Sequence, residues 1–189
     1  MAGVAGPMLR SDRRAGVRLL AGLLAGQAAA GVLLAVPAYL LSMATQALVP
    51  FAARLWALAA SCAVFAVADL MNRTPHVWRQ VPQALVHRLP PGKLGVAWGF
   101  DLGLLFTTQK VVSLIWVAIA AGILLAPASA AGIVIGAALL GGVAVTGASI
   151  AYRPGVHRRP LPLLRRLRWG SGAATAALCF VTAVQAWHA

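Results

Sequence analysis

The chain has 189 residues, of which 61% are hydrophobic and 10% charged, and its formal net charge is +13. Soluble globular domains carry about 25% charged residues, so this composition excludes an ordinary soluble fold and indicates a protein embedded in a lipid bilayer. The basic residues flank apolar segments, so we attribute the positive charge to membrane topology and expect no nucleic-acid partner. The lipid bilayer, with its anionic headgroups, is the partner that basic loops of this kind predict.

Five apolar segments are long enough to predict membrane-spanning helices, because a hydrocarbon core of about 30 Å needs roughly 20 apolar residues in helix. Residues 1–16 are predicted to be a cytoplasmic tail, and residues 17–189 a single polytopic membrane domain. The predicted spans are 17–41, 51–71, 94–126, 130–152 and 169–187. We therefore expect an all-α integral membrane protein with about five transmembrane helices.

The third segment, 94–126, is longer than one span requires. As a continuous helix it would extend about 50 Å, whereas crossing the membrane needs only about 30 Å. Either this helix tilts and protrudes, or it is broken near Phe106–Lys110, with a re-entrant half-helix as one form of the break. Two full spans here would place the basic segment 153–168 on the opposite side from the other basic segments, so we prefer five spans to six.

Basic residues gather in three segments, 10–18, 73–93 and 153–168. Short loops rich in Lys and Arg stay in the cytoplasm. With five spans, all three segments lie there, the N-terminus is cytoplasmic and the C-terminus is outside. Arginine is preferred to lysine and alanine is abundant, a bias typical of GC-rich bacterial coding sequences. We therefore expect a multi-pass protein of a bacterial plasma membrane.

The third segment also holds the residues that we single out as a candidate transport path, Asp101, Thr107, Thr108 and Lys110. A carboxylate within an apolar span is costly, so it usually has a partner or a function. Asp101 is therefore predicted to relay protons or contact substrate, or else to form a structural ion pair or remain hydrated near the interface. The Thr107–Lys110 stretch suits an unwound segment that lines a cavity, and equally suits hydroxyls that bond to the preceding helical turn.

Glycines spaced four residues apart form ridges on which membrane helices approach closely, so we interpret them as helix-packing sites. They are Gly22 and Gly26, then Gly95, Gly99 and Gly103, and then Gly132 and Gly136.

Other polar residues receive a structural interpretation. Asp69 and Arg73 are four apart, in the order that favours an ion pair on one helix. Cys62 and Cys179 each lie in an apolar run, where a cysteine is inert. No nucleotide-binding, hydrolase or metal-ligand motif is present, and the chain holds only three acidic residues. The sequence therefore gives no indication of an enzymatic activity, a metal or a cofactor, and leaves the question of an enzyme open.

Two stretches resemble the CcdA/DsbD-like transmembrane thiol–disulfide interchange family. One is the run from Ala21 to Gly26 followed by Pro37-Ala38-Tyr39-Leu40, and the other is Gly95, Gly99-Phe100 and Gly103 followed by Thr107-Thr108. The family carries one cysteine in each of these helices, whereas Gly31 stands at the first position here and Thr107–Lys110 contains none. The resemblance therefore implies a broken-helix conduit without the dithiol chemistry.

Two functions remain open at this point. The first is a transporter-like conduit for a small solute or ion, centred on the segment from Asp101 to Lys110. The second is a non-catalytic membrane subunit that anchors or assembles a partner complex. Either would form a homo-oligomer or join a membrane partner subunit, because five spans are few for a transporter.

Overall fold

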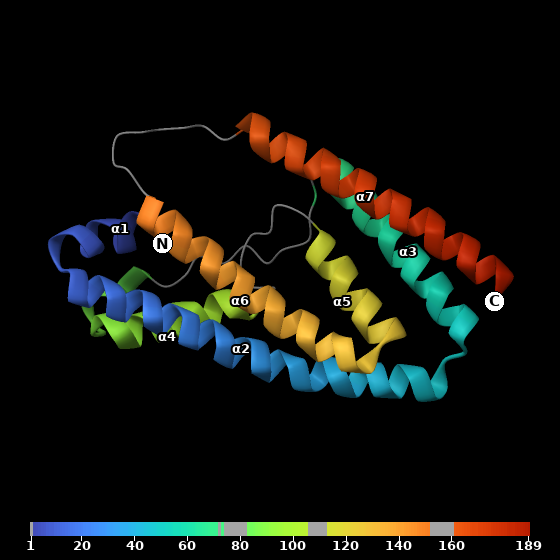
Figure 1. Ribbon diagram of the computed structural model, residues 1–189, viewed down its shortest axis with the longest axis horizontal. Coiled ribbons are helices and arrows are strands. Elements are labelled where there is room, and N and C mark those ends of the chain that lie inside the picture. Colours follow the sequence, from blue (N-terminus) through green and yellow to red (C-terminus); the bar gives the residue numbers. More distant parts are fainter. Residues whose placement is uncertain (1, 72, 74–82, 106–112, 152–160) are drawn as a thin grey trace. The chain divides into compact units, whose positions relative to one another are not determined.

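The structure is a computed structural model that describes residues 2–71, 73, 83–105, 113–151 and 161–189 (Figure 1). All regular secondary structure in these ranges is helical, which confirms the predicted all-α class. The helices are α1 (Ala2–Ser11), α2 (Arg13–Leu48), α3 (Phe51–Leu70), η1 (Gln83–His87), α4 (Pro91–Gly103), α5 (Leu114–Leu125), α6 (Pro127–Ala151) and α7 (Leu161–His188).

Four helices in the described part of the chain are long and apolar enough to cross a membrane, and this number differs from the predicted five. They are α2, α3, α6 and the Arg165–His188 part of α7. The difference arises in the segment 94–126, which forms two shorter helices, α4 and α5. Neither has the roughly 20 residues that a complete crossing requires.

Helix α4 ends where the chain turns out of the helical path. The Leu104 amide donates to the Phe100 carbonyl at 3.1 Å and closes the last turn. The next residue, Leu105, has a φ of 58°, in the left-handed region that side chains rarely adopt. The helix therefore stops at Gly103, and the predicted site residues Thr107, Thr108 and Lys110 lie outside the described residues.

Residues 1–16, which the sequence predicts to be a tail, contain the helix α1 (Ala2–Ser11). Helix α2 begins directly after it because Asp12 caps its first turn, accepting a hydrogen bond from the Ala15 amide at 3.0 Å. Leu9 of α1 contacts Gly16 of α2, and both helices contribute to one apolar cluster. Apolar contact with α2 thus holds part of this segment in place.

The chain divides into two compact units. The first unit comprises residues 1–34, 77–109 and 135–158, and the second comprises 35–76, 110–134 and 159–189. Each unit takes one part of the long helices α2 and α6.

In the first unit, α2 and α4 approach each other along their glycine ridges. A Cβ added at Gly26 would lie 2.2 Å from the Val96 carbonyl oxygen, and one at Gly99 would lie 2.0 Å from the Leu23 carbonyl oxygen. Gly22 and Gly95 make equally close approaches. Backbone contact of this kind is available only to residues without side chains, and it is the main way that helices associate in lipid.

In the second unit, α3 lies between α5 and α7. Leu58 and Cys62 of α3 and Val117 of α5 form its buried apolar cluster, and Cys179 of α7 packs against it. Gly172 of α7 contacts the Leu70 side chain near the end of α3. These contacts fix the place where the polar site described next is built.

Candidate functional site: a buried carboxylate that joins three helices

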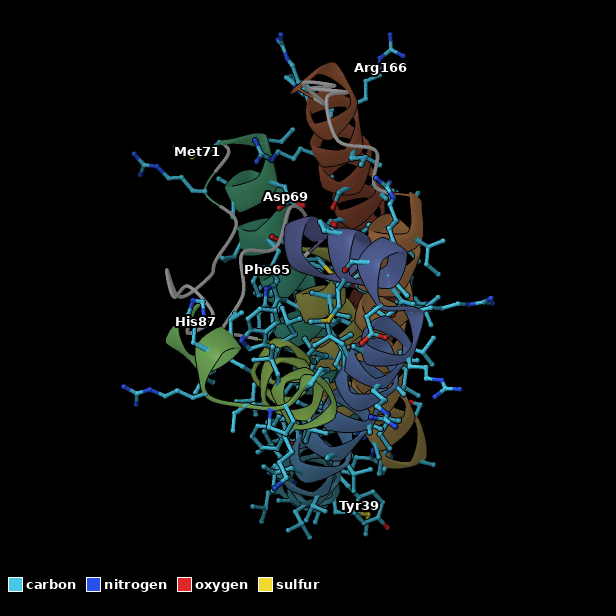
Figure 2. All side chains as sticks on the ribbon, turned by 90° about the vertical axis from the view of Figure 1, so that its left-hand side faces the viewer. Tyr39, Phe65, Asp69, Met71, His87 and Arg166 are labelled. Carbon is cyan, nitrogen blue, oxygen red and sulfur yellow. The ribbon has the colours of Figure 1, made fainter. Side chains whose placement is uncertain are left out.

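The most deeply buried acidic side chain in the described part of the chain is Asp69, with 1% of its surface exposed. It lies in the last turn of α3, beside Leu70 and Met71, at which the helix ends. In Figure 2 the Asp69 side chain points from α3 toward α7. A carboxylate buried in this way needs hydrogen-bond donors around it, because an unsatisfied charge in an apolar setting is very costly.

Two serines from other helices supply those donors. The Ser113 hydroxyl donates to Oδ1 of Asp69 at 2.6 Å, and the Ser171 hydroxyl donates to Oδ2 at 2.6 Å. The Ser113 backbone amide lies 3.0 Å from both carboxylate oxygens. Both hydroxyl contacts lie within the range of about 2.5–3.0 Å for O–H···O hydrogen bonds.

The carboxylate also caps a helix. Ser113 is the residue that precedes the first turn of α5, and its own side chain makes no capping bond to that turn. Asp69 therefore supplies a negative charge at the N-terminus of α5, where the helix dipole favours an anion.

The opposite end of α5 is held by the same neighbouring helix. Arg54 of α3 donates from Nη1 to the Leu124 carbonyl at 3.2 Å, so a cation lies at the C-terminus of α5. Ser42 of α2 donates to the Gly122 carbonyl at 3.2 Å, one turn further in. Helix α5 is thus fixed at both ends by charges whose signs complement its dipole.

A line of small polar side chains continues from Ser171 along the face of α7 that meets α3. Thr175 follows one turn later and is 0% exposed. Cys179, a further turn along, donates from Sγ to the Ala59 carbonyl of α3 at 3.3 Å. Thr182 bonds to the Leu178 carbonyl of its own helix at 2.8 Å. Serine, threonine and cysteine side chains therefore line the interface between α3 and α7 over most of its length.

The structure describes one of the four residues that the sequence singled out as a transport path. Asp101 lies two residues before the end of α4, in the first unit, and is half-buried. The other three, Thr107, Thr108 and Lys110, fall outside the described residues.

Sequence reasoning missed the importance of Asp69, which it interpreted as the partner of Arg73 on the same helix. It gave no role to Ser113 or Ser171. These serines are 44 and 102 residues away from Asp69 in the chain, so no local pattern connects them. One feature of the sequence could have pointed to Asp69. It is an acidic residue one position before the end of an apolar helix, and the chain has only three acidic residues in total.

No protein-family model, curated protein or solved structure matches this chain. Among the described residues, no three His, Cys, Asp or Glu side chains lie close enough together to hold a metal ion.

Proposed function

We propose that the protein is a conduit for a small solute or ion across the membrane, with the Asp69–Ser113–Ser171 junction as its gate. The observation that supports this proposal is the buried Asp69 carboxylate, which holds the N-terminus of α5 against α3 and α7. Ionisable residues within membrane helices are rare and commonly mark ion or substrate pathways.

The position of the junction in the chain supports the same proposal. Helix α5 is the second part of the divided segment 94–126, and its N-terminus is the end that Asp69 caps. In transporters with discontinuous helices, the ends of the half-helices meet ions and substrates, and segments next to them move. Asp69 therefore lies at the N-terminus of α5, where a change at this one side chain can hold or release the end of the helix.

A carboxylate favours a small cation or a proton as the solute. Such a solute competes with the Ser113 amide and the two hydroxyls for the same oxygens. When it binds, α5 loses its cap, and when it leaves, the cap forms again. Passage of the solute and release of α5 are coupled through this competition.

The test is flux through liposomes that contain the purified protein, with proton, Na⁺ and K⁺ gradients measured separately. We expect flux of one of these ions above that of empty liposomes, and a loss of at least about tenfold in Asp69→Asn. The matched control is Asp12→Asn, because Asp12 is exposed and caps α2. Undiminished flux in an assembled Asp69→Asn protein, or no flux in the unmodified protein, contradicts the proposal.

A second candidate function is that of a membrane subunit which assembles with a copy of itself or with another chain. The observation that favours it is one face of α6, where a Cβ added at Gly132, Gly136 or Gly147 would meet nothing within 4 Å among the residues that the structure describes. Small residues on an open helix face suit a neighbouring helix. Light scattering of the purified protein would test it, because Gly136→Leu should then lower the measured mass.

A further inference from the structure

We propose that Gln27 forms a hydrated site in the middle of the membrane, which takes water as a small, uncharged hydrogen-bond donor. This site lies in the first unit, apart from Asp69, and the inference stands whether or not the Asp69 junction acts as a gate.

The first observation is the side chain itself. Gln27 is 1% exposed, and within the described part of the chain its Oε1 has no hydrogen-bond partner. Val17 is the expected start of the first span, and Gln27 lies about 15 Å further along the helix. That distance is half of a hydrocarbon core of about 30 Å, where no lipid group can satisfy a carboxamide.

The second observation is the way neighbouring helices receive this side chain. Gly142 of α6 faces the carboxamide so closely that an added Cβ would clash with Oε1. Gly103 of α4 faces the Gln27 backbone, where an added Cβ would lie 2.9 Å from its Cα. The Gln27 carboxamide therefore occupies the space on α6 that a side chain at position 142 would otherwise fill.

A second polar group lies one helical turn from Gly142. Thr146 falls on the same face of α6, and its hydroxyl is also buried without a partner in the described part of the chain. Buried water typically satisfies two to four otherwise unpaired polar groups. Gln27 Oε1 and the Thr146 hydroxyl are two such groups, and neither carries a charge. An uncharged ligand therefore fits the site better than an ion.

The first test uses the unmodified protein and X-ray radiolysis, which forms hydroxyl radicals from bound water and oxidises the side chains next to it. Leu24 is the reporter, because its Cδ2 lies beside Gly142. Leu33 is the matched leucine, which is 56% exposed on the same helix. We expect Leu24 to be oxidised at least about fivefold faster than Leu33, and Gln27→Leu to remove this difference. Equal rates in the unmodified protein would overturn the proposal.

The second test does not depend on Gln27→Leu folding normally. Cys62 and Cys179 are replaced by Ala, and a single cysteine is introduced either as Gln27→Cys or as Ala29→Cys. Ala29 is exposed and lies two residues from Gln27 on the same helix. A small methanethiosulfonate reagent reacts with thiolates, which form only where water is present. We expect labelling of Gln27→Cys at least about tenfold faster than that of Ala29→Cys. Labelling no faster than that of Ala29→Cys would show a dry site.

Discussion

At the scale of single residues, the molecule depends on a few polar groups whose partners come from distant parts of the chain. Asp69 accepts hydrogen bonds from two serine hydroxyls and one backbone amide, and each donor offsets part of the cost of burying the charge. Removing a single donor is therefore more informative than removing the carboxylate, because the charge then remains buried with one bond fewer.

Ser171→Ala is predicted to lower the free energy of unfolding by about 1.5–3 kcal/mol, the usual value of a hydrogen bond to a charged group. Denaturation of the purified protein in detergent would measure this change. Ser61→Ala is the matched control, since Ser61 is half-buried on α3 and its hydroxyl bonds, among the described residues, only to the Ala57 carbonyl of its own helix. If both variants are equally stable, Ser171 contributes nothing to the junction.

The two cysteines are predicted to be replaceable. Cys62 lies in an apolar cluster, and the Cys179 thiol, a weak donor, donates to a backbone carbonyl that already belongs to a helix. Cys62→Ala and Cys179→Ala should each retain ion flux within about twofold in the liposome assay, because apolar surroundings leave a thiol unreactive. A complete loss of flux in either variant, with the protein still assembled, would indicate thiol chemistry.

At the scale of helices, the interface between α2 and α4 depends on backbone contact at glycines. Gly99→Ala would place a methyl group 2.0 Å from the Leu23 carbonyl oxygen, so the two helices must separate. We predict a loss of at least about 2 kcal/mol in the free energy of unfolding, in the range of overpacked cores.

The control for this prediction is on α6. Gly132→Ala adds the same methyl group where no atom of the described part of the chain lies within 4 Å, so stability should stay unchanged or rise slightly through better helix propensity. Thermal unfolding of the two variants in detergent gives the comparison. Equal melting temperatures would mean that the close approach of α2 and α4 does not determine stability.

The helices show how far the sequence could be interpreted. Apolar runs of about 20 residues follow directly from bilayer thickness, so α2, α3, α6 and α7 are predictable from composition alone. The glycine spacing in α2 and α4 is local as well, and these two ridges face each other. The division of 94–126 is only partly predictable, because the stop after Gly103 depends on the backbone at Leu105. The junction at Asp69 depends on contacts across 44 and 102 residues, which periodicity does not encode.

At the scale of the whole molecule, the directions of helices that pack together indicate on which side of the membrane a helix starts. Helix α5 runs antiparallel to α3, because Asp69 meets Ser113 and Arg54 meets Leu124. Helix α4 runs parallel to α2, since Gly22 meets Gly92 and Gly103 meets Gln27. We infer from the direction of α5 that it starts on the side of the membrane on which α3 ends.

Helix α5 accompanies α3 from Asp69 to Arg54, so we count it as a crossing in spite of its 12 residues. The number of crossings is then odd, and the C-terminus is expected outside. In the second unit, Tyr39 lies at the end opposite to Met71 and Arg166 (Figure 2). Arginines near short loops stay in the cytoplasm, so the end with Arg166 is expected there. Helix α7 runs away from Arg166, and Ala189 should therefore lie on the far side.

Reporter fusions test this topology. Alkaline phosphatase is active outside the cytoplasm, whereas green fluorescent protein is fluorescent inside it, so each fusion point is examined with both reporters. After Ala189 we expect active phosphatase and no fluorescence. After Arg88, in the basic segment between α3 and α4, we expect the reverse, and this fusion controls for expression. Fluorescence after Ala189 would require an even number of crossings. Helix α5 would then not cross, and the Asp69 junction could not join it to two membrane-spanning helices as a gate.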